Sequence, residues 1–169
     1  RAILAGRMRD GMKAAFDGTQ KFALSDLDFA WDTLPVKLPI RTDIGLEWEQ
    51  QRLANATEKP GVRASSAHEI AWIDRVKSGN PINIGRLRIG KMQALYMPGE
   101  LFVEYQLAAQ AMAPDDFVCM AAYGDYGPGY IGMACNYPEG GYETGVHVSR
   151  TAPEVEGVLL GASEKLLKR

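Results

Sequence analysis

The first pattern along the chain is an amphipathic helix predicted over residues 1–16, RAILAGRMRDGMKAAF. Its apolar residues recur at every fourth position, which places them on one side of a helix. They are Leu4, Met8, Met12 and Phe16. Asp17-Gly18 supplies the end of this helix. No capping residue precedes it and no Met initiates it, so we expect the chain to be a fragment that begins inside a larger protein.

Alternating apolar and polar residues predict a half-buried strand in LDFAWD, residues 27–32. The apolar residues that we expect to face the core are Leu27, Phe29 and Trp31. VKLPI, residues 36–40, is a candidate extension of this strand. Residues 46–56 then show a weaker helical pattern, and TEKPG, residues 57–61, has the composition of a turn.

A further helix is predicted to begin at Ser66, because Ser66 and Glu69 have the spacing of a capping box. Gly79-Asn80-Pro81 ends it. The next stretch, residues 82–97, has strand character on both sides of Gly90-Lys91 and predicts a hairpin.

The second arm of that hairpin runs into Pro98-Gly99-Glu100, which opens a predicted helix, LFVEYQLAAQAM. FVCMAAY, residues 117–123, is a continuous apolar run that predicts a strand buried on both faces. The last helix follows a second capping box, made by Thr151 and Glu154. These elements predict a mixed α/β (α+β) fold with helices packed on a mixed sheet, and residues 1–169 as a single globular unit.

Composition excludes several classes of protein. The chain has 169 residues, of which 46% are hydrophobic and 24% charged, as in one ordinary domain with a core. Its net charge is −2 and it contains no cluster of five basic residues, so we expect no nucleic-acid partner. Cys119 and Cys135 lack the C-x-x-C spacing of a zinc knuckle or redox pair, which leaves two free thiols or one disulfide between them.

Two histidines, His68 and His147, are too few for most self-contained metal or triad sites. The sequence also contains no H-E-x-x-H, G-x-S-x-G or Walker motif. We expect His68 to be exposed near the start of a helix and His147 to lie in a strand or loop.

Glu100 is a stronger candidate for site chemistry. A carboxylate where a strand turns into a helix lies at the positive end of the helix dipole, which favours the ionised form that a metal site needs. The alternative is that Glu100 only complements the dipole. Glu104 and Tyr105, one turn further on, are expected to be exposed or to line a groove.

The segment YGDYGPGYIGMACNYPEGGYE, residues 123–143, gathers five tyrosines and six glycines. Three interpretations are open. The loop packs on its own rings, or it presents aromatic platforms to a carbohydrate or lipid. In the third, one phenol faces a metal while another donates a hydrogen bond to a developing oxyanion.

The order of these motifs resembles the C-terminal part of the catalytic domain of the neutral/alkaline non-lysosomal ceramidases. LRIGKMQALYMPGELFVEYQ is followed by GYI and then by a Tyr-Glu pair, and the resemblance covers residues 82–143. Its most specific element is the spacing Y-x6-Y-x4-Y-E, formed by Tyr130, Tyr137, Tyr142 and Glu143. The residues after GYI, Gly132 and Met133, differ from the hydroxyl residues common in that family, a change at the pocket wall that bears on the substrate more than on the reaction type.

The resemblance implies zinc-dependent hydrolysis of the N-acyl amide bond of ceramide or a ceramide-like lipid. By motif position, Glu100 and Tyr130 are the implied zinc ligands and Tyr142 the implied catalytic donor to the oxyanion. Two further histidine ligands are expected outside this chain, so the fragment alone should be inactive.

The same resemblance implies several partners: a lipid amide substrate, the remainder of the catalytic domain and the membrane surface. It also implies an extracellular or periplasmic location. A non-catalytic lipid- or glycan-binding domain that keeps the fold without the metal is the alternative function.

Overall fold

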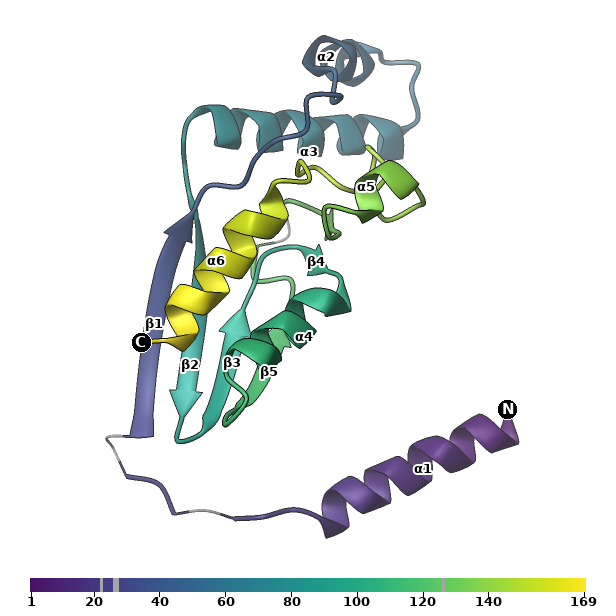
Figure 1. Cartoon of the computed structure of the whole chain (residues 1–169). Coiled ribbons are helices and arrows are strands. Elements are labelled where there is room, and N and C mark those ends of the chain that lie inside the picture. Colours follow the sequence, from purple (N-terminus) through teal and green to yellow (C-terminus); the bar gives the residue numbers. More distant parts are fainter. Residues whose placement is uncertain (22, 26–27, 126) are drawn as a thin grey trace.

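Four strands form the central sheet of the computed structural model, which describes residues 1–21, 23–25, 28–125 and 127–169 (Figure 1). The strand order is β1-β2-β3-β5, and β4 and β6 form a separate two-stranded sheet. In chain order the elements are α1 (Ala2–Asp17), β1 (Phe29–Val36), α2 (Leu46–Ala54), α3 (Pro60–Lys77), β2 (Ile82–Ile89), β3 (Met92–Tyr96), β4 (Glu100–Leu101), α4 (Val103–Met112), β5 (Phe117–Ala121), β6 (Tyr130–Ile131), α5 (Asn136–Glu139) and α6 (Val155–Leu167). The predicted mixed α/β class is confirmed.

Two kinds of strand pairing build the central sheet. β1 and β2 are antiparallel, with Leu34 opposite Ile84, and β2 and β3 form the predicted antiparallel hairpin. β3 and β5 are parallel, because α4 returns the chain to the same end of the sheet before β5 begins. The sheet is therefore mixed, as expected from the sequence.

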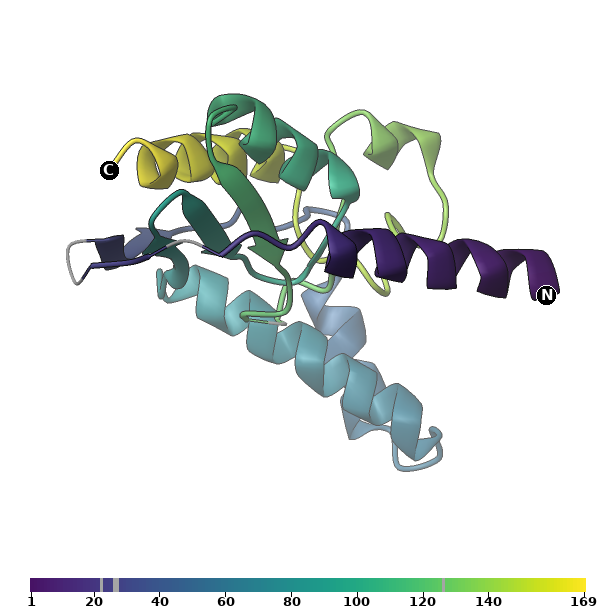
Figure 2. The same ribbon diagram turned by 90° about the horizontal axis from the view of Figure 1, so that it is seen from below.

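The hydrophobic core lies between one face of this sheet and helices α4 and α6 (Figure 2). Ile84 and Leu95 from the sheet, Tyr105 from α4 and Leu159 from α6 are all buried there. Burying each large apolar side chain stabilises the fold by about 1.5–3 kcal/mol. α2 and α3 pack on each other near the end of the sheet where β1 stops and β2 begins (Figure 1).

The alternation predicted for β1 is present, but the predicted inward face is wrong. Phe29 and Trp31 are 60% and 54% exposed, whereas Leu34 packs against the core. Leu27 lies outside the described residues. α6 covers the face that carries Leu34, so the larger aromatic residues lie on the opposite face of the sheet. Phe117 of β5 is likewise 70% exposed, which contradicts the prediction that this strand is buried on both faces.

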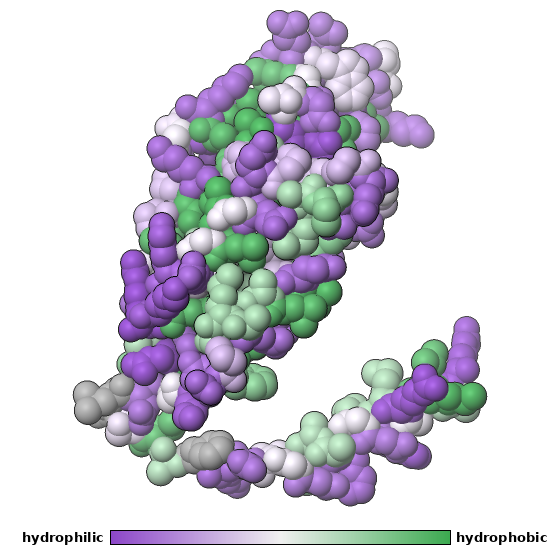
Figure 3. Space-filling view, viewed as in Figure 1, coloured by the Kyte–Doolittle hydropathy of each residue, from purple (hydrophilic) through white to green (hydrophobic). Residues whose placement is uncertain are grey.

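The predicted first helix is confirmed as α1, which ends next to Gly18. None of its 16 residues is buried, and its apolar stripe reaches the surface beside charged side chains (Figure 3). Among the described residues, no helix is long and apolar enough to cross a membrane.

Both predicted capping boxes are wrong. α3 begins at Pro60, whose fixed φ suits the first turn of a helix, so Ser66 and Glu69 lie buried in its interior. α6 has Glu154 as its N-cap, and the hydroxyl of Thr151 instead bonds Tyr137. Cys119 and Cys135 are both free thiols.

Candidate functional site

Glu100 and Tyr130 lie side by side because β4 and β6 pair in parallel register, with Glu100 opposite Tyr130. The Glu100 N–H donates to the Gly129 carbonyl at 2.8 Å, and the Phe102 N–H donates to the Ile131 carbonyl at 3.0 Å. The predicted position of Glu100 at the start of a helix is wrong, since Phe102 is the N-cap of α4 and Glu100 precedes it in a strand. The strand pairing therefore positions this carboxylate.

Two glycines allow β4 and β6 to approach. Gly99 has φ +63° and Gly129 has φ +70°, a region that residues with a side chain rarely occupy. A Cβ on Gly99 would lie 2.5 Å from the Gly129 carbonyl oxygen, and a Cβ on Gly129 would overlap the Val148 carbonyl oxygen. Both positions thus require glycine for close backbone contact as well as for their dihedral angles.

An open cavity of about 420 Å³ lies over this strand pair. Seven residues line it: Glu100, Leu101, Phe102, Val103, Glu104, Tyr130 and Glu143. The expectation that Glu104 is exposed or lines a groove is confirmed, whereas the sequence assigned Glu143 no role of its own. The position of Glu143 in the Tyr-Glu pair of the family spacing is the sequence feature that could have identified it as a site residue. The cavity combines three carboxylates and one phenol with three apolar residues, of which Val103 is exposed.

Tyr142, near the end of residues 123–143, lies next to Tyr130 of this strand pair. Its ring lies edge-on to the ring of Tyr130, with centroids 6.0 Å apart and an interplanar angle of 72°. The Tyr142 side chain is 68% exposed. The structure thus brings together all three residues that the sequence selected, Glu100, Tyr130 and Tyr142.

Two hydrogen bonds from other elements hold the segment after β6 in place. The buried Tyr105 hydroxyl donates to the Gly132 carbonyl at 3.0 Å, and the Ala134 N–H donates to the Glu156 carboxylate at 2.6 Å. Burial raises the pKa of Tyr105, so this hydroxyl keeps its proton and remains a donor. The expectation that Tyr105 is exposed or lines a groove is wrong, because it belongs to the core.

Two other tyrosines of the segment, Tyr123 and Tyr137, do not line the cavity. Tyr137 bonds Thr151 at 3.0 Å, and the Arg41 guanidinium lies 5.7 Å from its ring centroid. Tyr123 adopts φ +64° and is 55% exposed, while Tyr126 lies outside the described residues.

Neither histidine lines the candidate cavity, and both His68 and His147 are exposed, His147 within a turn after the segment. In the described part of the chain, no group of three or more His, Cys, Asp or Glu side chains is arranged to hold a metal ion. Glu100 and Tyr130 therefore offer two oxygen donors, which is fewer than a zinc shell usually contains.

Comparisons with known proteins give limited similarity. No protein-family model matches the chain, and no curated protein matches it. The chain is similar to the crystal structure of the neutral ceramidase from Pseudomonas aeruginosa, with 18% identity, a TM-score of 0.49, and coverage of 83% of this chain and 29% of that one. It is also similar to a ceramidase complexed with C2, with 22% identity, a TM-score of 0.44, and coverage of 53% and 15%. The chain thus spans less than a third of either structure, and TM-scores below 0.5 do not establish a family.

Proposed function

We propose that this chain is part of a zinc-dependent amide hydrolase that cleaves the N-acyl amide bond of ceramide or a ceramide-like lipid into a sphingoid base and a fatty acid. The observation that carries the proposal is the pairing of Glu100 with Tyr130 in one strand register, with the Tyr142 ring against Tyr130. These residues are 12 to 42 positions apart in the sequence, and they are the three that the motif spacing selected.

The residues at the cavity fit part of a zinc site. The Glu100 carboxylate is a usual zinc ligand, and the Tyr130 phenol is the oxygen donor that the family resemblance assigns. Three carboxylates line the cavity and none of its lining residues is basic, so the local charge suits a cation. Two histidines from the remainder of the catalytic domain would complete the shell. When bound there, zinc would act as a Lewis acid toward the amide carbonyl.

The chain's own residues would then do three things. Glu100 and Tyr130 would hold the metal through oxygen atoms. Tyr142 would donate its phenolic hydrogen bond to the substrate's amide oxygen as negative charge develops on it, a task that a protonated phenol performs at neutral pH. Val103 would contact the hydrocarbon part of the substrate, because it is an exposed apolar residue at the cavity.

The proposal includes where this chemistry takes place. A lipid amide reaches a catalytic cavity from a membrane or micelle, so the protein should associate with a membrane surface while it acts. By family resemblance we place it outside the cell or in the periplasm. The remainder of its own catalytic domain is its obligatory partner.

Zinc content and activity of the intact protein test the proposal. Glu100→Gln and Tyr130→Phe should each lower zinc occupancy, while Glu47→Gln, a matched change on the exposed face of α2, should not. Tyr142→Phe should retain zinc and lower the turnover of ceramide by about 100- to 1,000-fold, the usual cost of an oxyanion donor. Unchanged zinc occupancy in both ligand variants would disprove the ligand assignment.

The second candidate is a non-catalytic lipid- or glycan-binding domain. The exposed ring of Tyr142 beside Tyr130 favours it, because aromatic platforms bind sugars and lipids without a metal. In that case, the intact protein would bind ceramide-containing vesicles or glycans without zinc and without releasing fatty acid.

A further inference from the structure

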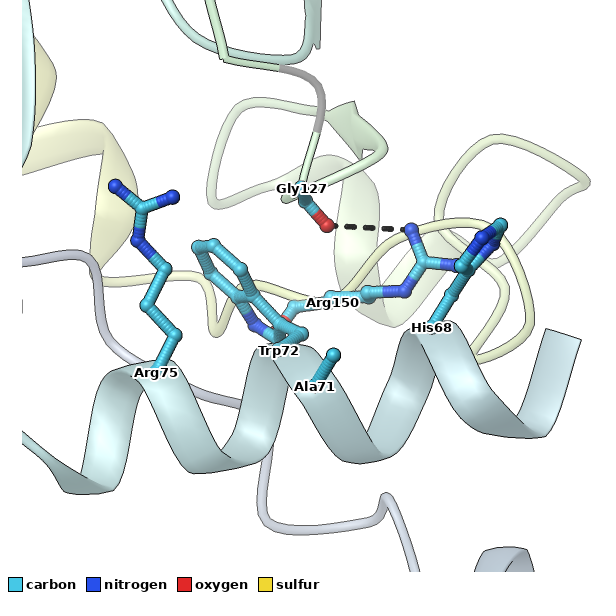
Figure 4. A pocket seen from close by; sticks show the side chains of 6 residues that line it. All are labelled: His68, Ala71, Trp72, Arg75, Gly127 and Arg150. Carbon is cyan, nitrogen blue, oxygen red and sulfur yellow. Dashed lines mark hydrogen bonds between the residues drawn. The ribbon is translucent and has the colours of Figure 1, made fainter. Parts of the chain in front are cut away.

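The chain segment that leads into Tyr130 rests against helix α3. A Cβ on Gly127 would lie 3.0 Å from the Trp72 ring, so this segment already packs tightly on the helix. Beside this contact is a cavity of about 360 Å³ lined by His68, Ala71, Trp72, Arg75, Gly127 and Arg150 (Figure 4). Arg150 and Arg75 lie at opposite ends of the cavity, with Trp72 between them (Figure 4).

Arg150 connects α3 to this segment through four hydrogen bonds. Its Nε donates to Glu69 Oε1 at 2.7 Å, and its Nη1 donates to the Gly127 carbonyl at 3.3 Å (Figure 4). Its backbone N–H donates to the Pro128 carbonyl at 3.0 Å, and its own carbonyl accepts from Trp72 Nε1 at 3.2 Å. Arg150 and Glu69 are 9% and 3% exposed, so their ion pair is shielded from water.

The next residues carry this constraint to the candidate site. Gly129 follows Pro128, and its carbonyl accepts the Glu100 N–H at 2.8 Å. The Tyr130 N–H donates to the Val148 carbonyl at 2.8 Å, two residues before Arg150 in the chain. One or two hydrogen bonds, together with the backbone of neighbouring residues, therefore connect Arg150 to both implied ligands, Glu100 and Tyr130.

A second ion pair joins α3 to Asp125, which precedes this segment in the chain. Arg75 Nη1 lies 2.8 Å from Asp125 Oδ2, and the Asp125 carbonyl accepts the Gly99 N–H at 2.8 Å. This pair is more exposed than the Glu69–Arg150 pair, so water screens it more strongly. Arg150 is therefore the stronger of the two connections.

We propose that Arg150, anchored by Glu69 of α3, is a positioning residue that holds Tyr130 in register with Glu100. Arg150 and Glu69 do not line the candidate cavity, so they act on it through the backbone of residues 127–130. The inference deepens the proposed function and rests on it for its catalytic meaning. The positioning itself can be measured without metal or substrate.

Hydrogen exchange of single backbone amides in the metal-free protein provides that measurement. Arg150→Lys cannot keep both the Nε and the Nη1 bonds, so exchange at the amides of Glu100 and Tyr130 should become about tenfold faster or more. Amides in the β1–β2 pairing should be unchanged. Arg86→Lys is the matched control, because Arg86 is another buried arginine that pairs with a carboxylate, Asp32, away from the cavity.

Glu69→Gln provides a second variant if Arg150→Lys does not fold. Glutamine keeps the size of the side chain and an oxygen that can accept from Arg150, so acceleration at Glu100 and Tyr130 should be smaller than in Glu69→Ala. Equal acceleration throughout the sheet, or none at Glu100 and Tyr130, would overturn the proposal.

Zinc affinity of the intact protein then separates this inference from the proposed function. Arg150→Lys should weaken zinc binding about tenfold, and Arg86→Lys should leave it unchanged. If the wild-type protein binds no zinc while the local exchange effect is present, the proposed function fails and the positioning role stands. If zinc binds normally in Arg150→Lys despite faster exchange, Arg150 does not position the ligand and the inference fails.

Discussion

Replacing Gly129 with alanine tests how tightly the candidate site is built. Gly129 precedes Tyr130, has φ +70° and packs against the Val148 carbonyl. Gly140 is a matched control, since it has φ +75° and a Cβ there would meet no atom within 4 Å. Both substitutions therefore place alanine at a positive φ, and only Gly129→Ala adds a steric cost.

The magnitudes follow from the contacts. Alanine at a positive φ costs about 1–3 kcal/mol, and Gly140→Ala, at φ +75° and ψ −160°, should show this backbone cost alone. Gly129→Ala must also push residues 129 and 148 apart, which breaks the bond from the Tyr130 N–H to Val148 (2.8 Å) and strains that from the Arg150 N–H to Pro128 (3.0 Å). At about 1 kcal/mol for each bond, Gly129→Ala should lower the free energy of unfolding by about 3–5 kcal/mol.

Urea unfolding of the two variants and the wild-type chain measures this difference. Because neither change alters the surface exposed on unfolding by much, the denaturant dependence should stay constant and the midpoints can be compared directly. Gly129→Ala should be about 2 kcal/mol less stable than Gly140→Ala. Equal midpoints for the two variants would refute the argument that β6 requires close contact with residue 148.

Three further predictions concern the surroundings of the site. Tyr105→Phe should lower the free energy of unfolding by about 1–3 kcal/mol, because it leaves the Gly132 carbonyl without its buried donor. Urea titration measures this loss, with Tyr96→Phe, a change at an exposed tyrosine, as the control. Equal losses of stability in the two variants would contradict the prediction. Burial raises the pKa of the Glu69 carboxyl above its ordinary value of 4.5, although the charge of Arg150 acts in the opposite direction. The folded protein therefore holds this proton more tightly than the unfolded chain does. The resulting stabilisation is fully present below pH 4.5 and is lost as the pH rises through the raised pKa of the folded state. Thermal unfolding of Glu69→Gln should therefore lack that decline, and parallel pH profiles for variant and wild type would refute it. Finally, the isolated chain should bind zinc weakly in calorimetry and release no fatty acid from ceramide, and stoichiometric tight zinc would contradict the assignment of two missing ligands.

Local sequence signals predicted the elements that carry their own pattern. The hairpin around Gly90-Lys91, the helix after Pro98-Gly99-Glu100 and the stop at Gly79 all appear in the structure. Each depends on neighbouring residues alone, because turns and helix ends are encoded by glycine and proline at fixed offsets. The motif spacing also selected three residues that the fold brings together.

The remaining features depend on contacts between distant residues. β4 and β6 have two residues each, so they are too short to show a period, and their pairing follows from the backbone approach at Gly99 and Gly129. The Glu69–Arg150 ion pair joins positions 81 residues apart, and Ser66 with Glu69 gave a misleading capping signal. For β1, alternation fixed the two faces of the strand but could not say which one α6 would cover.

The charge at the candidate cavity bears on the choice between the two functions. Glu100, Glu104 and Glu143 line one cavity, and none of its lining residues is basic. In the described part of the chain these carboxylates do not form a group arranged to hold a metal ion, so a metal there depends on the two histidines expected outside this chain. The zinc content of the intact protein therefore decides between the hydrolase and the metal-free binding domain.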